Sequence, residues 1–382
     1  MKKIKFKEIF EIKKGKKVEP VDESFPNKVR YIQIEDLRDD RSVKYCFHDD
    51  NYVYANSESI IVAWDGANAG TVSYGLEGAI GSTLAVLEAK TKDIYIPFVG
   101  KFLQSKFQYL RDTCTGATIP HISRKALENL LIPMPSFEEQ VFISKILDKA
   151  QSLVETRKAQ IESLDQLTQS VFLEMFGDIR INSKKFKQVK LNEVITKITT
   201  GKSLAGEGIS EYKVLKTSAV SYKFFKQNEV KYLPQDYVPP VSHIVNKGDV
   251  LVSRMNTSEL VGAAAYVFNE IKNVALPDRI WKLHYSRKIN PIFLWYFINQ
   301  SYFRDKVTDI ATGTSGSMKN ISQKKYLNLS ILLPDISLQN KFAEFVYKIQ
   351  IEKDKMDKGL IELNNIFNSL MQRTFNGKLF PE

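Results

Sequence analysis

The sequence predicts an α+β fold: two similar mixed α/β domains separated by two long antiparallel helices that form a coiled coil with pseudo-two-fold symmetry. An internal duplication is the first observation, because the segment from Ile122 aligns without gaps with the segment from Ile321, an offset of 199 residues. A heptad repeat with the same phase in both copies is the second. The third is length, since 382 residues fit two domains of about 100–200 residues each.

The first domain is expected at residues 1–135 and the second at residues 178–335. A weaker repeat joins their starts, where Lys5–Ile9 resembles Lys190–Val194. Each domain is expected to contain a helix that begins at a proline, which suits the first helical position. Its aromatic residues favour a core role over a base-stacking platform. These helices are expected from Pro97 to Leu110 and from Pro291 to Phe303, and β-rich runs are found at 29–34, 59–64, 83–87 and 249–252.

Two long spacer helices are expected at residues 136–177 and 336–377, with a tail at 378–382. Apolar residues recur with a seven-residue period along both helices. Polar residues interrupt this seam at Arg157, Thr168, Lys353 and Thr374, where they would fix the register of the pair. The predicted apolar seam comprises Ile143, Leu147, Val154, Ile161, Leu164, Val171, Phe342, Val346, Ile349, Leu360, Leu363 and Leu370.

The ends of both helices carry sequence signals. Ser136 followed by Glu139 is a capping-box pattern, whereas the second helix is expected to begin at Ser337 without such a glutamate. Gly177 and Gly377 are the expected C-terminal glycines. A helix of about 35 residues is roughly 50 Å long, so we expect the two helices to pack on each other. The alternative is that each helix packs only on its own domain.

A net charge of +11 favours a polyanionic partner, with nucleic acid first and an acidic membrane surface second. A basic protein without any polyanion remains the alternative. Two cysteines and four histidines lie in no zinc-ligand pattern. No apolar run of signal or membrane-spanning length follows the N-terminus, so a cytoplasmic protein without membrane insertion is expected.

Signatures of catalysis are missing from the sequence. Gly201-Lys202-Ser203 resembles the end of a nucleotide-binding loop, but Thr196 occupies the position of the required second glycine. No clustered carboxylates predict a two-metal nuclease, and no glycine-rich dinucleotide or methyl-donor fingerprint is present. The sequence therefore predicts a protein that is not an enzyme and that binds no metal or cofactor itself.

Two loops have the composition of a DNA contact, although a solvated surface loop has the same composition. They open with Thr115-Gly116 and Thr312-Gly313 and contain small, hydrogen-bonding and basic residues. One further candidate segment follows a predicted strand in each domain, Trp64 to Asn68 in the first and Arg254 to Thr257 in the second. Trp64 is equally compatible with a core position. The predicted DNA-binding residues are Lys16, Lys17, Asn68, Thr115, Thr118, His121, Ser123, Arg124, Lys202, Arg254, Asn256, Ser315, Ser317, Lys319, Asn320 and Lys324.

The duplicated order of domain and helix, with the segment from Ile122-Ser123 through Ile132-Pro133-Met134-Pro135 to Gln140, resembles the specificity subunit of type I restriction–modification enzymes. The second copy is degenerate, since Leu332 to Gln339 lacks one proline and both glutamates. The resemblance implies two target-recognition domains that each read half of a bipartite site in double-stranded DNA, with the helices as spacer. It also implies docking of two methyltransferase subunits, with restriction and motor subunits completing the complex.

In that family, S-adenosylmethionine and ATP with Mg²⁺ belong to the partner subunits, so the resemblance implies no cofactor on this chain. Two other functions remain open. A stand-alone DNA-binding regulator should show a compact helix-turn-helix and dimerise, and a coiled-coil scaffold should show no salt-dependent affinity for DNA.

Overall fold

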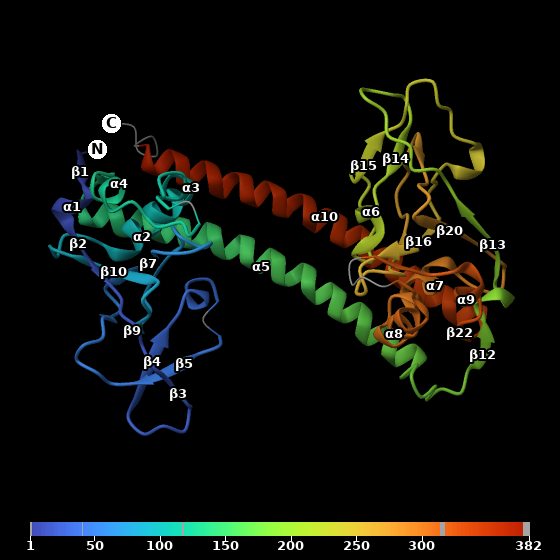
Figure 1. Ribbon diagram of the computed structural model, residues 1–382, viewed down its shortest axis with the longest axis horizontal. Helices are drawn as coiled ribbons and strands as arrows, with labels where there is room; N and C mark the ends of the chain where they lie inside the picture. Colours follow the sequence, from blue (N-terminus) through green and yellow to red (C-terminus); the bar gives the residue numbers. More distant parts are fainter. Residues whose placement is uncertain (1, 40, 117, 314–317, 377–382) are drawn as a thin grey trace. The chain divides into compact units, whose positions relative to one another are not determined.

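The computed structural model describes residues 2–39, 41–116, 118–313 and 318–376. The chain divides into two compact units (Figure 1). Unit 1 comprises Met1–Ala159 with Asp357–Glu382, and unit 2 comprises Gln160–Met356. Each unit therefore contains one globular domain together with a part of both long helices.

The globular domain of unit 1 mixes short strands with short helices. Its elements are β1 (Lys2–Lys5), α1 (Phe6–Ile9), β2 (Phe10–Lys14), β3 (Pro20–Val21), β4 (Lys28–Ile32), η1 (Glu35–Leu37), β5 (Lys44–Phe47), β6 (Tyr54–Ala55), β7 (Ser59–Ala63), β8 (Val72–Tyr74), β9 (Gly78–Ile80), β10 (Leu84–Ala89), α2 (Ile96–Ser105), α3 (Phe107–Asp112), α4 (Arg124–Glu128) and β11 (Leu131–Met134).

The globular domain of unit 2 repeats this texture. Its elements are β12 (Lys187–Lys190), η2 (Leu191–Glu193), β13 (Ile195–Thr200), β14 (Lys213–Leu215), α6 (Ser218–Ser221), β15 (Val230–Tyr232), η3 (Val241–His243), β16 (Val250–Ser253), β17 (Met255–Asn256), β18 (Ala264–Tyr266), β19 (Val274–Ala275), β20 (Ile280–Tyr285), α7 (Pro291–Ile298), α8 (Ser301–Ile310), β21 (Lys319–Asn320), α9 (Gln323–Leu327) and β22 (Ser330–Leu333).

The same four-stranded antiparallel sheet lies at the centre of both domains. Its strand order is β2-β10-β7-β8 in unit 1 and β13-β20-β16-β18 in unit 2. The paired registers match, since Leu84 lies opposite Ala63 in the first sheet and Ile280 opposite Ser253 in the second. Helix α2 packs on β7 and β8, and α7 packs on β16 and β18. The duplication inferred from sequence is therefore also a duplication of sheet topology.

A second sheet differs between the domains. Unit 1 has five strands in the order β3-β5-β4-β9-β6, and unit 2 has three in the order β15-β14-β19. Both contain one parallel pair, β4 with β9 and β14 with β19. The pairing of β4 with β9 joins segments about 50 residues apart, which local sequence patterns do not encode. This part of each fold was missed in the sequence analysis.

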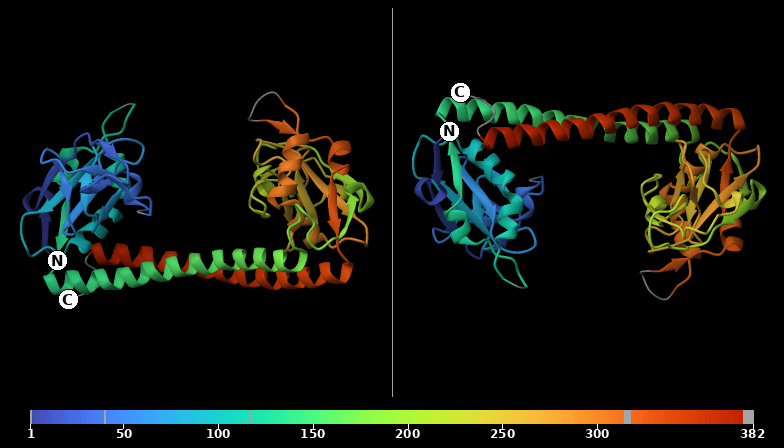
Figure 2. Two further views of the ribbon diagram at one scale, coloured as in Figure 1. Left: turned by 90° about the horizontal axis from the view of Figure 1, so that it is seen from below. Right: turned by 90° about the horizontal axis from the view of Figure 1, so that it is seen from above.

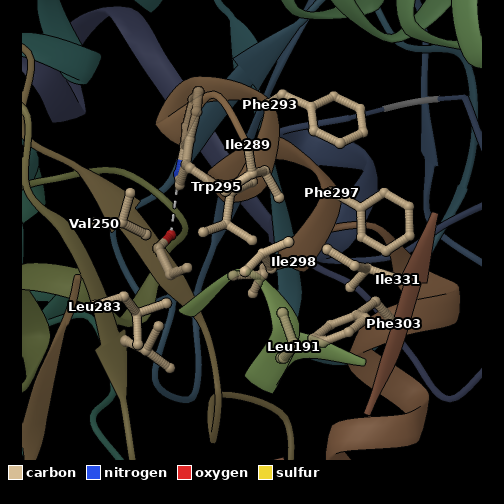
Figure 3. Packing of buried hydrophobic residues seen from close by; sticks show 14 of the residues in the cluster. Leu191, Val250, Leu283, Ile289, Phe293, Trp295, Phe297, Ile298, Phe303 and Ile331 are labelled. Carbon is tan, nitrogen blue, oxygen red and sulfur yellow. Dashed lines mark hydrogen bonds between the residues drawn. The ribbon is translucent and has the colours of Figure 1, made fainter. Parts of the chain in front are cut away.

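The two proline-started helices differ from their expected form, because each is broken into two. Helix α2 ends at Ser105, and Lys106 with φ −98° and ψ 11° separates it from α3. In unit 2, α7 ends at Ile298 and α8 begins at Ser301. The expected core role of the aromatic residues in α7 is confirmed, since Phe293, Trp295 and Phe297 are buried (Figure 3). The indole N–H of Trp295 donates to the carbonyl of Ala264.

The long helices are α5 (Phe137–Phe176) and α10 (Ile336–Phe375). The capping box of α5 is confirmed: the Ser136 N–H donates to Glu139, and the Glu139 N–H donates to the Ser136 hydroxyl. Gly177 ends α5 with φ +69°, a conformation that favours glycine. The expected start of α10 at Ser337 is wrong, because the carbonyl of Asp335 already accepts from the N–H of Leu338. Gly377 lies outside the described residues.

Within each unit the two helices run antiparallel. In unit 1 the end of α10 lies beside the beginning of α5 (Figure 2), and Gly359 faces the guanidinium of Arg157. In unit 2 the end of α5 meets the beginning of α10, where Phe172 and Phe342 have ring centroids 5.4 Å apart. Every predicted seam residue is buried or half-buried, including the polar positions. The heptad phase therefore faces the partner helix along both segments.

Each helix end also joins the core of a globular domain. In unit 1, Phe375 of α10 contacts Phe98 and Phe102 of α2, with ring centroids 5.5 and 5.3 Å apart. In unit 2, Phe176 of α5 contacts Phe293 of α7 at 4.8 Å. Each helix thus contacts both the other helix and a domain, so the alternative that each helix packs only on its own domain is wrong.

A buried glutamine ties each long helix to its domain. Gln140 accepts from the N–H of Tyr95 and donates to the carbonyls of Asp93 and Pro135. Gln339 accepts from the N–H of Asn290 and donates to the carbonyls of Lys288 and Pro334. The two glutamines are 1% and 0% exposed, so these hydrogen bonds satisfy backbone groups that water does not reach. Across the part of the chain that the structure describes, no helix combines the length and apolarity needed to cross a membrane.

Candidate nucleic-acid interface

The loop that follows α3 and the loop that follows α8 have the same backbone construction. Thr115 pairs with His121 in unit 1, and Thr312 pairs with Asn320 in unit 2. The glycine after each threonine has a positive φ, +96° at Gly116 and +139° at Gly313. A Cβ there would lie 2.4 and 2.5 Å from a carbonyl oxygen of the same loop. The glycine that follows each threonine is therefore required by the shape of these loops.

Both loops join the central sheet at the end of one strand. In unit 1, Asp65 follows β7 and bridges to His121. In unit 2, Met255 follows β16 and pairs with Asn320. The backbone thus places the same two segments side by side in each domain, a pairing that the sequence did not predict.

Three charged or titratable side chains meet at this point in unit 1. Nδ1 of His121 lies 2.6 Å from Oδ1 of Asp65, and Nζ of Lys14 lies 2.8 Å from Oδ2. The carboxylate is 15% exposed, whereas the imidazole is 46% exposed. Burial alone would raise the pKa of Asp65, but the hydrogen bonds from His121 and Lys14 outweigh it and lower the pKa. Asp65 is therefore an ionised acceptor for both neighbours.

The equivalent place in unit 2 holds different side chains. Thr200 ends its strand as Lys14 does, and Met255 and Asn320 replace Asp65 and His121. Nε of the neighbouring Arg254 and Oδ1 of Asn320 are buried and find no hydrogen-bond partner among the residues described. Buried polar atoms without partners are rare, and these two lie side by side on residues that replace Trp64 and His121 of unit 1.

Asn256 was expected to read a base, but its amide is engaged within the protein. Its Nδ2 donates to the hydroxyls of Ser221 and Ser253, and its Oδ1 accepts from the N–H of Thr257. Both amide hydrogens are used in this arrangement. The structure gives Asn256 the geometry of a residue that orients the segment after Arg254.

Other predicted residues also have partners inside the loops. Ser123 caps α4, since its hydroxyl accepts from the N–H of Ala126, and Arg124 pairs with Glu128. Nζ of Lys319 donates to the carbonyl of Gly313 and so closes the second loop. These contacts are compatible with an interface, but they leave fewer free donors than the sequence suggests.

The two glycine–lysine turns lie at the ends of β2 and β13. Gly15 and Gly201 lack room for a side chain, because a Cβ would lie 2.2 Å from the carbonyl oxygen of Gly81 and 1.7 Å from that of Leu276. This close approach explains the glycines without a phosphate. The following lysines, Lys16, Lys17 and Lys202, are exposed, as are Thr115, Thr118 and Lys324, whereas Asn68 is half-buried. Ser315 and Ser317 lie outside the described residues.

Asp65 and Lys14, which hold His121 in place, were not among the predicted residues. Asp65 lies in a segment that the sequence analysis had selected, but its partner is 56 residues away. The missing information was the pairing of the strand end with the loop. Trp64, by contrast, is 8% exposed and belongs to the core.

Within the described ranges no cluster of three or more His, Cys, Asp or Glu side chains has the arrangement of a metal site. The interface instead offers hydroxyls, amides and basic side chains on duplicated loops, which are groups that contact phosphates and base edges.

The chain has the architecture of a duplicated recognition protein. It contains two α+β domains with the same central sheet and the same type of loop, together with an antiparallel pair of helices. The family described as the type I restriction modification DNA specificity domain matches residues 1–165. The specificity subunit of type I restriction enzyme MjaVIII from Methanocaldococcus jannaschii is 30% identical over 372 residues, covering 91% of this chain and 86% of that protein. The chain therefore belongs to the family of type I restriction enzyme specificity subunits.

Other relatives agree with this assignment. The specificity subunit of EcoKI from Escherichia coli strain K12 is 24% identical and covers 79% of this chain and 69% of that protein. The crystal structure of the type I restriction–modification S subunit from M. genitalium has the same fold, with a TM-score of 0.60 at 18% identity. That alignment covers 100% of this chain and 96% of the other, so the shared fold includes both domains and both helices.

Proposed function

We propose that this chain selects the DNA target of a type I restriction–modification complex by reading a bipartite site, one half with each domain. The observation that carries the proposal is the duplicated loop surface. Its backbone bridges are the same in both units, whereas the side chains differ, Asp65 and His121 against Met255 and Asn320. Two domains that read different DNA sequences require the same loop backbone with different hydrogen-bond donors and acceptors.

The long helices are proposed to set the spacing between the two half-sites. Each has 40 residues, which corresponds to roughly 60 Å. Their seam is closed in unit 2 by an ion pair between Lys353 of α10 and Asp165 of α5, at 2.5 Å. A charged pair within a mainly apolar seam favours a single register, so the length of the spacer would be fixed.

The outer faces of the helices are proposed to bind two methyltransferase subunits. Large apolar side chains point outward from both helices, although the seam itself is covered. Leu153 and Leu167 of α5 are 51% and 45% exposed, and Ile361 and Ile366 of α10 are 62% and 55% exposed. Exposed apolar residues on long helices favour a helix-packing partner.

The chain itself is proposed to be non-catalytic and to bind no cofactor. S-adenosylmethionine would be bound by the methyltransferase subunits, and ATP with Mg²⁺ by restriction and motor subunits where the host has them. Support comes from the family assignment and from side chains that suit recognition. We infer a cytoplasmic site of action, which is supported by DNA as the proposed ligand and by the net charge of +11.

Methylome sequencing tests the proposal directly. The chain is expressed with its methyltransferase subunit in a host that lacks other methylation, and every modified site is mapped. We expect one motif with two specified halves and an unspecified spacer of constant length. Methylation of a continuous palindrome, or methylation without sequence preference, would contradict the proposal.

The same strain separates the two other functions. A stand-alone regulator would bind a specific DNA site without any copurifying methyltransferase. A scaffold would copurify with protein partners, but its affinity for DNA would not fall with salt concentration as phosphate contacts require.

A further inference from the structure

The charged triad of Lys14, Asp65 and His121 in unit 1 has a consequence for how the first half-site is read. An ionised carboxylate only accepts hydrogen bonds, so Nδ1 of His121 must carry the hydrogen in the 2.6 Å contact with Asp65. In the neutral form of the imidazole this leaves the lone pair on Nε2, because one ring nitrogen donates and the other accepts. Nε2 lies on the ring edge that does not contact the carboxylate, and the imidazole is 46% exposed.

The arrangement suits a base better than a phosphate. Asp65 places a negative charge directly behind the imidazole, and Lys14 is engaged with that carboxylate at 2.8 Å. The outward acceptor Nε2 has nothing to offer a phosphate, which accepts hydrogen bonds but does not donate them. In the major groove, only adenine N6 and cytosine N4 present exocyclic amino donors.

We propose that His121, in its neutral form, reads one base pair of the first half-site by accepting a hydrogen bond at Nε2 from the amino group of an adenine or a cytosine. Asp65 is the positioning residue that fixes the tautomer of His121, and Lys14 fixes the orientation of Asp65. This inference rests on the proposed function, because it requires that unit 1 bind DNA through this surface.

Unit 2 supports the assignment by contrast. The backbone pairing is retained there, yet Thr200, Met255 and Asn320 occupy the positions of Lys14, Asp65 and His121. The fold of the loop therefore does not require the hydrogen-bonded group of Lys14, Asp65 and His121. Only the domain of unit 1 has this group, and the fold does not need it. The DNA sequence that this domain reads is the best explanation for its presence.

Two substitutions of His121 separate the role of Nδ1, which contacts Asp65, from the role of Nε2, which is proposed to contact the base. In H121N the amide can still donate to Asp65, but the side chain no longer reaches where Nε2 lies. In H121Q the longer side chain reaches the outer position with an amide. We expect H121N to lose discrimination at one base position of the first half-site by about fivefold or more, the lower end for a base contact. H121Q should retain part of it.

The substitution D65N gives a sharper test, because it should change the preferred base. Lys14 can only donate, so the amide oxygen of the introduced asparagine must face Lys14 and the amide N–H must face His121. Nδ1 of His121 then accepts, and Nε2 carries the hydrogen. The preference at the same position should move from an amino-bearing base to one with an acceptor, guanine or thymine.

The measurement is the methylation motif of the complex assembled with each variant, read over a library of randomised sites. The second half-site, read by unit 2, is the internal control for folding and assembly. A uniform fall in methylation over all sequences, or an unchanged first half-site, would overturn the proposal for His121 and Asp65. Absence of any bipartite motif with the unchanged chain would instead overturn the proposed function.

Discussion

Gln140 and Gln339 show how single side chains join an extended helix to a globular domain. Each amide satisfies three backbone groups, in the segment before α2 or α7 and in the turn that precedes the long helix. Both lie 199 residues apart in the duplicated segment, and both are buried. The shared contacts explain why this glutamine occurs in both copies although the residues before it differ: it makes polar contacts with strict geometry.

Replacing either glutamine by methionine keeps its length but removes these hydrogen bonds. We expect Q140M and Q339M each to lower the free energy of unfolding by at least roughly 1–3 kcal/mol, because buried backbone groups lose their partners. Urea unfolding provides the measurement, and Q166M at an exposed position of α5 is the matched control. Equal stability of Q140M and Q166M would show that water replaces the amide.

Buried lysines form a second residue-scale device. Lys101 of α2 pairs with Asp148 of α5 at 2.5 Å in unit 1, and the two side chains are 8% and 58% exposed. Lys353 and Asp165 have similar exposure in unit 2, 10% and 51%. Burial alone would lower the pKa of Lys101, but hydrogen bonds to Asp148 and Tyr74 outweigh it and raise the pKa. The buried ammonium of Lys101 therefore depends on the ion pair more than the exposed carboxylate of Asp148 does.

Unequal exposure predicts unequal effects of breaking the pair. D148A leaves the ammonium of Lys101 buried without its carboxylate, whereas K101M leaves Asp148 in water. We expect D148A to destabilise unit 1 more than K101M does, by less than the roughly 3–5 kcal/mol of a fully buried pair. The same order is expected for D165A and K353M in unit 2. Thermal unfolding of the four variants measures this order of destabilisation. A reversed order would contradict the conclusion that each lysine is more buried than its aspartate.

At the scale of elements, the loops of the candidate interface depend on Gly116 and Gly313. We expect G116A to abolish recognition of the first half-site and G313A that of the second, because a Cβ would collide with a loop carbonyl. Gly75 has φ +77° but free space around its Cβ position, so G75A carries similar backbone strain without a collision. Methylation motifs of the three variants provide the measurement. Loss of both half-sites in G116A would indicate general misfolding.

The elements also show what a sequence can and cannot predict. The heptad phase, the Ser136 capping box and the terminal Gly177 are local patterns, and the structure confirms each of them. The break at Lys106 and the parallel pairing of β4 with β9 depend on tertiary contacts and were missed. The loops were found from composition, but the partner of His121 was not, because Asp65 reaches it only through the fold.

At the scale of the whole chain, the division into two units follows from the helices. Each unit takes one part of α5 and the complementary part of α10, so neither helix belongs to one domain alone. The beginning of α5 and the end of α10 contribute Ile143, Leu147 and Phe375 to the core of unit 1. The remaining parts contribute Phe172, Phe176 and Phe342 to the core of unit 2. Length changes in one helix must therefore be matched in the other.

Leu164 and Leu363 lie 199 residues apart at equivalent seam positions, so a heptad inserted after each one preserves the seam. The added seven residues lengthen each helix by about 10 Å, close to the rise of three base pairs at 3.4 Å each. The decisive measurement is the methylation motif of the complex assembled with this lengthened chain. We expect a spacer longer by about three base pairs between two unchanged half-sites. An unchanged spacer, or altered half-sites with the spacer preserved, would contradict the account of two reading domains on a helical ruler.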